Sequence, residues 1–148
     1  DDFNARFSAR LRTYEYLIIN RVGDLSINKN KAWHIKQKID LEIMKQGAKI
    51  LEGKHDFSTF RSSSCSANSP IKKMNPIKIH KINDTIKIKI SSKSFLQNQV
   101  RSMVGCLKYL STGKWSMTDF KKAFKSKKRG NCAPPAPACG LYLSKVKY

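Results

Sequence analysis

Near the start of the chain, a cluster of arginines precedes two tyrosines. Arg6, Arg10 and Arg12 are three of seven arginines in a chain that otherwise carries its positive charge on lysine. Guanidinium groups bind phosphate through paired hydrogen bonds and stack on planar groups, and an aromatic ring such as Tyr14 can stack on a base. The segment therefore predicts contacts with nucleic-acid phosphates and bases. The alternative is that Tyr14 and Tyr16 are core aromatics on one face of a strand.

A second candidate is Arg101, which stands beside an apolar helical stripe in the segment FLQNQVRSMVG. An unpaired buried charge costs several kcal/mol, so a half-buried guanidinium needs an acidic partner. Arg101 is therefore either half of a structural salt bridge or a group that holds a carboxylate in a functional site. A third candidate is Leu141, which offers an apolar surface after Gly140, where glycine permits a close backbone approach. Its spacing alone is that of an ordinary strand.

Familiar catalytic and metal-binding patterns are missing from the sequence. It contains no GxSxG, Walker, HExxH or GxGxxG motif. His55 and Asp56 are adjacent, but neighbouring residues in a turn point apart, so we interpret Asp56 as a turn residue rather than half of a dyad. The four cysteines have neither CxxC nor zinc-finger spacing, so we expect reduced thiols and no metal site.

The charge balance restricts the class of partner. The chain has 30 lysines and arginines against 10 acidic residues, a formal net charge of +20. Self-repulsion of this size opposes compaction unless a polyanion offsets it, which favours nucleic acid over a merely solvated lysine surface or an anionic membrane. No apolar run approaches the ~20 residues of a membrane span, and the first residues do not resemble a leader peptide. We expect a cytoplasmic protein.

The elements that must position these residues follow from hydrophobic periodicity. A period of two predicts a strand over residues 12–20, and a period near 3.6 predicts helices from Asp40 to Glu52, over residues 95–112, and from Ser116 to a stop at Gly130. Residues 21–37 and 57–70 are interpreted as loops.

Two further segments complete the expected fold. Alternating isoleucines on either side of Asn83-Asp84 predict a hairpin whose inner face includes Ile77, Ile79 and Ile82, with lysines facing water or phosphate on the other side; these lysines are Lys78, Lys87 and Lys89. The proline-rich residues 132–139 predict an extended strap, followed by a terminal strand. The length of 148 residues suits one domain. We expect an α+β fold, an antiparallel sheet with helices packed on one face.

Five ordered motifs resemble the tRNA pseudouridine synthase A family across essentially the whole chain. They are ARFSA at 5–9, Arg12-x-Tyr14-x-Tyr16, GKHDFSTFR at 53–61, FLQNQVRSMVG at 95–105 and APACGLYL at 136–143. The resemblance implies an isomerase, usually a cytoplasmic homodimer, that converts uridine to pseudouridine in the tRNA anticodon stem-loop without metal or organic cofactor. It also implies two similar α/β halves flanking a basic cleft.

One family motif, the GRTDxGVH segment that carries the nucleophilic aspartate, does not occur in this sequence. The resemblance therefore implies a C-terminal domain without the nucleophile-bearing half, and we expect this chain alone to be inactive. By the same resemblance, Tyr14 stacks on the target uracil, Arg101 pairs with the nucleophilic carboxylate and Leu141 closes on the base from the other side. The alternative is a non-catalytic, basic RNA-binding module.

Overall fold

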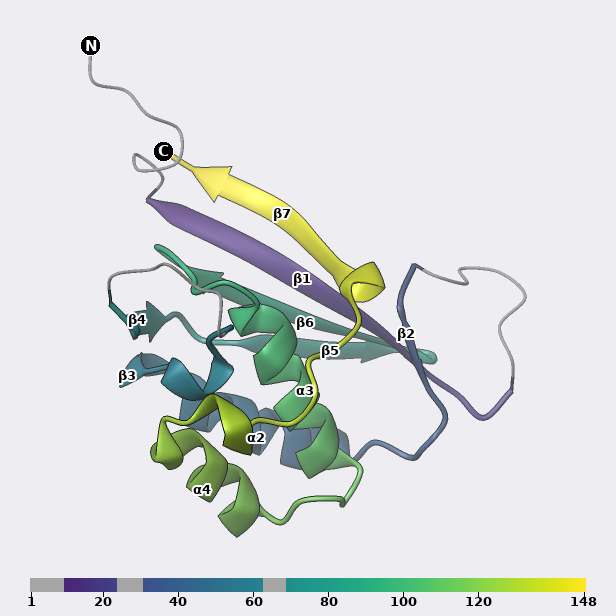
Figure 1. The fold of residues 1–148 in the computed structure, drawn as a ribbon. Coiled ribbons are helices and arrows are strands. Elements are labelled where there is room, and N and C mark those ends of the chain that lie inside the picture. The colour runs from purple at the N-terminus through teal and green to yellow at the C-terminus, as the bar shows by residue number, and fades with distance from the viewer. Residues whose placement is uncertain (1–9, 24–30, 63–68) are drawn as a thin grey trace.

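The central strand of the fold is the one that carries the two tyrosines. The computed structural model describes residues 10–23, 31–62 and 69–148 (Figure 1). Strand β1 (Leu11–Asn20) pairs along one edge with antiparallel β6 (Thr85–Ser92). Its other edge is shared by antiparallel β7 (Leu141–Lys147) and by β2 (Trp33–Ile35), which is parallel to it.

The far edge of β6 carries the other strands. β5 (Lys78–Ile82) forms the predicted hairpin with β6, and β4 (Ile71–Met74) pairs with the end of β6 and with β3 (Gly53–Asp56). The result is a seven-stranded sheet. The predicted α+β fold is confirmed, with the correction that β2 makes the sheet mixed. Strands β2, β3 and β4 were missed because three or four polar-rich residues are too few to show a period.

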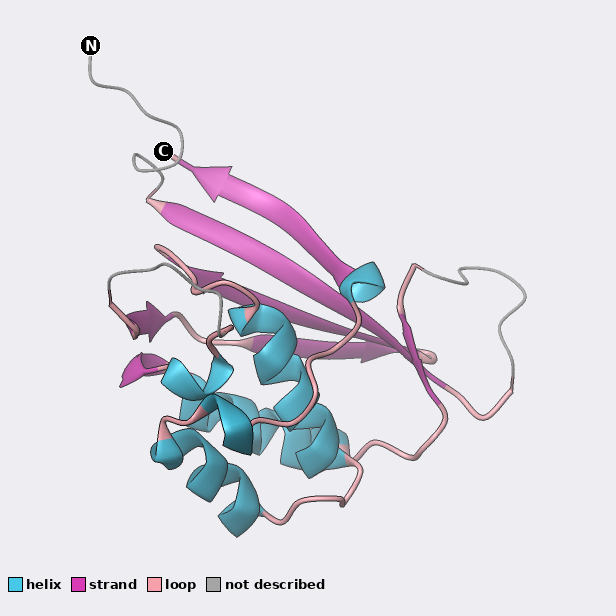
Figure 2. Ribbon diagram, in the orientation of Figure 1, coloured by secondary structure: helices cyan, strands magenta, loops and turns pink. Residues whose placement is uncertain are grey.

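Three α-helices among the described residues lie on the same side of the sheet (Figure 2). They are α2 (Leu41–Leu51), α3 (Gln99–Ser111) and α4 (Met117–Ser126). The hydrophobic core fills the space between α2, α3 and the sheet, with Ile86, Ile88 and Ile90 of β6 fully buried. Helices on one face were predicted, and this arrangement leaves the opposite sheet face to its lysines.

Two of the three predicted helix starts are set by side-chain caps. The third is wrong, since α3 begins at Gln99 rather than at residue 95, and its N-cap Asn98 makes no side-chain capping hydrogen bond. Asp40 accepts a hydrogen bond from the Ile43 amide at the start of α2, and Ser116 and Asp119 form a reciprocal capping box at α4. The predicted end of α4 at Gly130 is wrong. The helix ends at Ser126 because Lys127 adopts a left-handed conformation with φ of 58°.

The predicted hairpin is confirmed, but the prediction that Ile82 lies on its inner face is wrong. Ile79 is buried and opposes Ile88, but Ile82 is 73% exposed. Side chains alternate along a strand, so a residue three positions after Ile79 points to the opposite face. The chain reverses at Asn83, which has a positive φ of 53°.

The segment 132–139, called the proline strap below, runs along α3 toward the start of β7 (Figure 1). It is extended as predicted, apart from its last two residues in the one-turn 3₁₀ helix η3 (Ala138–Gly140). A Cβ on Gly105 of α3 would lie only 2.1 Å from the Pro134 carbonyl oxygen. The strap can therefore lie this close to α3 only because residue 105 has no side chain.

Candidate active site

The two tyrosines of β1 share the helix-bearing face of the sheet, since they are two residues apart. Tyr14 is half-buried, and its ring stands almost perpendicular to that of Phe95, with 5.2 Å between centroids. Tyr16 is fully buried, and its hydroxyl donates a 2.6 Å hydrogen bond to the Pro137 carbonyl oxygen. The alternative of a core aromatic is therefore correct for Tyr16, whereas Tyr14 is only partly buried and packs against the edge of the core.

Arg101 projects from the first turn of α3 to the proline strap. Its Nε donates a 2.7 Å hydrogen bond to the Ala136 carbonyl oxygen, and the Ala136 amide donates back to the Arg101 carbonyl oxygen at 2.8 Å. Within residues 10–23, 31–62 and 69–148, no carboxylate forms a salt bridge with this guanidinium. The expectation of a structural salt bridge is thus not met there, and the strap carbonyl fixes the side chain instead.

The strap also brings Arg101 close to Tyr16. Ala136 and Pro137 are consecutive, and their carbonyls accept from Arg101 and Tyr16 respectively. Burial raises the pKa of the Tyr16 phenol well above its ordinary range, the Cys139 thiol adds to the rise, and the positive charge of Arg101 opposes it. Tyr16 is therefore a neutral donor at physiological pH that holds the strap beside Arg101.

Leu141 lies directly opposite Tyr16 as the first residue of β7. Cross-strand partners point to the same side of a sheet, so Leu141 shares the face of both tyrosines, and it is half-buried. A Cβ on the preceding Gly140 would lie 2.7 Å from Tyr16 Cζ and 2.8 Å from the Leu17 carbonyl oxygen. Glycine at 140 is what allows β7 to approach β1 closely enough to place Leu141 here.

The three residues predicted from the resemblance thus lie on the same side of the sheet. Arg101 and Leu141 are linked through the strap and Tyr16, and Tyr14 lies two residues before Tyr16 on β1. We call Tyr14, Arg101 and Leu141 the Tyr-Arg-Leu site. Sequence reasoning missed the partners that hold them, namely Phe95 and the carbonyls of Ala136 and Pro137. Because a backbone carbonyl has no side-chain signature, only the rigid proline-rich composition pointed to the strap.

The arginines of the N-terminal cluster have separate surroundings. Arg12 is half-buried, and its Nη1 donates to the Lys93 carbonyl oxygen at 3.0 Å. Arg10 is exposed and comes just before the start of β1, where its backbone amide donates a hydrogen bond to the Lys147 carbonyl oxygen. Arg6 lies outside the described residues. The predicted RNA contacts of these arginines stay a prediction.

Lysines of β5 and β6 lie on the sheet face away from the helices. Glu15 of β1 forms salt bridges with Lys87 at 3.8 Å and with Lys89 at 3.5 Å. Lys78 opposes Lys89 across the hairpin. One acid therefore offsets part of the positive charge on this face.

His55 and Asp56 have separate partners and form no dyad, but both lie in strand β3, and only the Asp56 side chain takes part in a turn. His55 Nε2 lies 2.7 Å from the Glu52 carbonyl oxygen, and its ring packs edge-on against Phe124. Asp56 Oδ1 accepts from the Ser58 amide at 2.8 Å. In the part of the chain that the structure describes, no three potential metal ligands form a group, and no helix is both long and apolar enough to cross a membrane.

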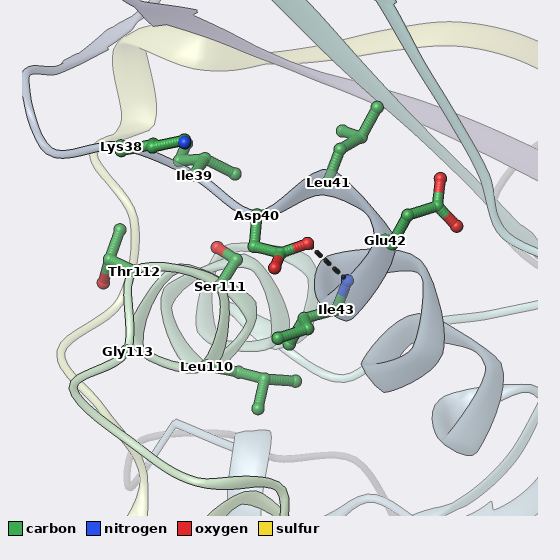
Figure 3. Close-up of a pocket in the computed structure, with 10 residues that line it drawn as sticks. All are labelled: Lys38, Ile39, Asp40, Leu41, Glu42, Ile43, Leu110, Ser111, Thr112 and Gly113. Carbon is green, nitrogen blue, oxygen red and sulfur yellow. Dashed lines mark hydrogen bonds between the residues drawn. The ribbon is translucent and has the colours of Figure 1, made fainter.

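A surface hollow lies between the start of α2 and the end of α3 (Figure 3). Its lining includes Asp40, Leu110 and Ser111, with the Asp40 carboxylate engaged in capping α2. Leu110 is nine residues beyond Arg101 on α3, about 14 Å along the helix axis. This hollow is thus separate from the Tyr-Arg-Leu site.

Comparison with known proteins identifies the family. A family model described as tRNA pseudouridine synthase matches residues 48–148. The chain belongs to the tRNA pseudouridine synthase family. Proteins named tRNA pseudouridine synthase A from Pelagibacter ubique, Xanthobacter autotrophicus and Azorhizobium caulinodans are 55%, 48% and 47% identical to it, over 99%, 100% and 100% of the chain. The chain spans 59%, 60% and 57% of the length of these three relatives. Arg101 and Leu141 fall within the segment that matches the family, and the relatives' alignments extend over essentially the whole chain.

Proposed function

We propose that this chain is the C-terminal domain of a tRNA pseudouridine synthase and supplies the substrate-binding part of its active site. The complete enzyme would isomerise uridine to pseudouridine in the tRNA anticodon stem-loop. The observation that carries the proposal is the gathering of Tyr14, Arg101 and Leu141 on one side of the sheet in a member of this family. The nucleophilic aspartate comes from a segment outside this chain, since its motif is absent here.

Tyr14 is proposed to stack on the target uracil. Extruding a base from a helix or loop costs a few kcal/mol, and stacking on an aromatic ring returns about 1–3 kcal/mol. The perpendicular contact with Phe95 fixes the plane of the Tyr14 ring before the base arrives. A fixed ring loses little conformational entropy on binding, so more of the stacking free energy contributes to affinity.

Arg101 is proposed to keep the incoming aspartate ionised. A positive charge close to a carboxylate lowers its pKa and so opposes the effect of burial in a dry pocket. The Ala136 carbonyl already orients the guanidinium through Nε. No salt bridge among the described residues competes for it.

The proposed reaction rearranges bonds within one nucleotide. The carboxylate attacks the sugar C1′ or the uracil ring, and the glycosidic C1′–N1 bond breaks. The uracil turns, and C5 bonds to C1′ as the bond to the carboxylate breaks. C5 loses its proton and N1 takes one up, so the nucleotide keeps its composition and the free carboxylate is regenerated. Leu141 is an apolar wall that confines the detached ring without hydrogen bonds that would resist its rotation. As the resemblance implies, this scheme uses no metal or organic cofactor.

Wider features of the family belong to the same proposal. The net charge of +20 supports binding to the tRNA backbone, through lysines and through Arg6, Arg10 and Arg12. We propose a homodimer in the cytoplasm for the complete protein. The alternative for the isolated chain is RNA binding without catalysis, through the same aromatic and basic groups.

The deciding assay is tritium release from tRNA labelled at uridine C5. We would compare the 148-residue chain with the same chain joined to the N-terminal segment of the Pelagibacter ubique relative. Release is expected only from the joined protein. Release by the short chain would refute the assignment of the nucleophile to another segment, and failure of a folded joined protein would refute the enzyme proposal.

Matched variants of the joined protein test the individual roles. Tyr14→Phe keeps the ring and should preserve stacking, whereas Tyr14→Ala should lose it and weaken tRNA binding. Arg101→Met should abolish most turnover because the aspartate loses its cationic partner. Unchanged turnover in Arg101→Met would show that the pairing role is wrong.

A further inference from the structure

Two cysteines that the proposed function does not use lie in contact on the helix side of the fold. Cys106 is in the middle of α3, and Cys132 begins the proline strap directly after the 3₁₀ helix η2 (Arg129–Asn131). Their Sγ atoms are 3.5 Å apart. Cys106 is buried and Cys132 is half-buried, so Cys132 is the more exposed residue of the two.

The surroundings of Cys132 favour a negative charge on its sulfur. Arg129 Nη1 lies 3.9 Å from Cys132 Sγ and donates a 2.6 Å hydrogen bond to Ser102 Oγ. The hydrogen bond from the Cys106 thiol lowers the pKa of Cys132, and Arg129 and Ser102 add to the fall against the opposing effect of burial. The same sulfur contact and burial raise the pKa of Cys106. The two thiols are therefore unequal, and Cys132 is the easier of the two to deprotonate.

We propose that Cys106 and Cys132 form a peroxide-reactive dithiol, with Cys132 as the attacking thiolate and Cys106 as the resolving thiol. Reactive cysteines characteristically sit beside a basic residue in a partly exposed position, and a neighbouring second thiol resolves the oxidised product. The inference concerns the chain's own sulfur atoms and is independent of the proposed function.

The chemistry balances with hydrogen peroxide as the oxidant. The Cys132 thiolate attacks one peroxide oxygen, the O–O bond breaks, and hydroxide leaves and takes a proton from solvent, which gives Cys132 sulfenic acid and water. The Cys106 sulfur then attacks Cys132 Sγ, and the hydroxyl departs with the Cys106 proton as a second water. Two thiols are each oxidised by one electron, and one peroxide is reduced to two waters.

The positions of the two sulfurs suit the second step. A disulfide bond is about 2.05 Å long, so the sulfurs must approach by about 1.5 Å from their present separation. Cys106 is held in a helix, whereas Cys132 follows a single 3₁₀ turn that can shift. The new bond would tie the start of the strap to α3, the two elements that are also joined by Arg101 and Ala136.

The test treats the purified 148-residue chain with a small excess of hydrogen peroxide and maps its thiols by mass spectrometry. We expect a loss of 2 Da from two hydrogens, a peptide pair linked through Cys106 and Cys132, and reversal by dithiothreitol. Cys106→Ser should instead stop at a sulfenic acid on Cys132 that dimedone traps. A dominant linkage between any other cysteines, or dimedone labelling elsewhere, would overturn the proposal.

Cys139 provides the matched control. It is exposed, and its sulfur contacts the Ala32 carbonyl oxygen rather than another thiol. Cys139→Ser should leave the Cys106–Cys132 linkage unchanged, and Cys132→Ser should abolish it. Circular dichroism of each variant establishes that it is folded, and Cys132→Ala replaces Cys132→Ser if the hydroxyl disturbs the fold.

A second measurement reports on Cys132 without oxidation. The charged and titratable groups that face it are Arg129 from η2 and the Cys106 thiol from α3. Iodoacetamide should therefore alkylate Cys132 at a lower pH than it alkylates the thiol of N-acetylcysteine, and Arg129→Leu should move the Cys132 profile to higher pH. A Cys132 profile at higher pH than that of N-acetylcysteine, or one that Arg129→Leu does not move, would refute the role of Cys132 as the attacking thiolate.

Discussion

Removal of a single oxygen atom tests whether Tyr16 holds the proline strap. In Tyr16→Phe the ring and its burial remain, and the 2.6 Å hydrogen bond to Pro137 is lost. A net hydrogen bond is worth about 0.5–1.5 kcal/mol, and a buried group left without a partner raises the cost to about 1–3 kcal/mol. The Pro137 carbonyl keeps only a long contact of 3.5 Å with the Gly140 amide. We therefore expect Tyr16→Phe to lower the free energy of unfolding by about 1.5 kcal/mol.

The assay is urea unfolding of the 148-residue chain at pH 7, followed by circular dichroism. A change of 1.5 kcal/mol corresponds to a fall in the urea midpoint of about 0.5–1.5 M at an m-value of about 1–3 kcal/mol/M. Tyr14→Phe is the matched control, since no hydrogen bond of the Tyr14 hydroxyl to another described residue is present, and it should alter stability by less than about 0.5 kcal/mol. The reasoning is refuted if Tyr16→Phe is as stable as the unaltered chain, or if Tyr14→Phe is the more destabilised of the two.

Three further outcomes follow from the same contacts. Gly105→Ala should destabilise the chain by about 1–3 kcal/mol, since its methyl group would collide with the Pro134 carbonyl. Gly130→Ala is the control and should change the unfolding free energy little, since a Cβ there meets nothing within 4 Å. Equal urea midpoints for the two variants would contradict the close contact between α3 and the strap. Burial raises the Tyr16 pKa, so the unfolded chain loses this proton first, and stability should fall by up to about 1.4 kcal/mol per pH unit above the ordinary value of 10.0. Urea unfolding measured from pH 9 to 11 should show a smaller loss of unfolding free energy in Tyr16→Phe than in the unaltered chain. The same pH dependence in both proteins would show that Tyr16 is not the source of the loss. In the joined protein, Arg101→Lys should reduce tritium release more than tRNA affinity, because lysine cannot reproduce the Nε contact to the strap. A larger loss of tRNA affinity in a filter-binding assay than of tritium release would contradict this role of Arg101.

The sequence predicted those elements in which apolar residues recur at a regular spacing over many positions. The strand around Tyr14 and the three helices have enough apolar positions to show a period, and Asp40 and Ser116 carry capping side chains. Short strands such as Trp33–Ile35 form because β1 offers them an edge, a tertiary effect that no local pattern records. The error at Ile82 came from treating an isoleucine as inward-facing without regard to its alternation.

The candidate site was only partly open to prediction. Tyr14, Arg101 and Leu141 were chosen from motifs, and the structure places them on one side of the sheet. The carbonyls that orient Arg101 and Tyr16 belong to the strap backbone, so residue identity gave no sign of them. Gly140 did suggest a close backbone approach, which the collision of a Cβ with Tyr16 supports.

The length of the proline strap sets the alignment of the last strand. Gly140 lies against the Tyr16 ring, and Leu141 is the first residue of β7 that pairs with β1. The number of residues in the strap therefore decides which residue of β7 lies opposite Tyr16. An insertion of one residue would advance β7 by one place and turn its side chains to the opposite faces. A natural or engineered insertion in the strap would thus remove Leu141 from the site while leaving the composition of the strand untouched.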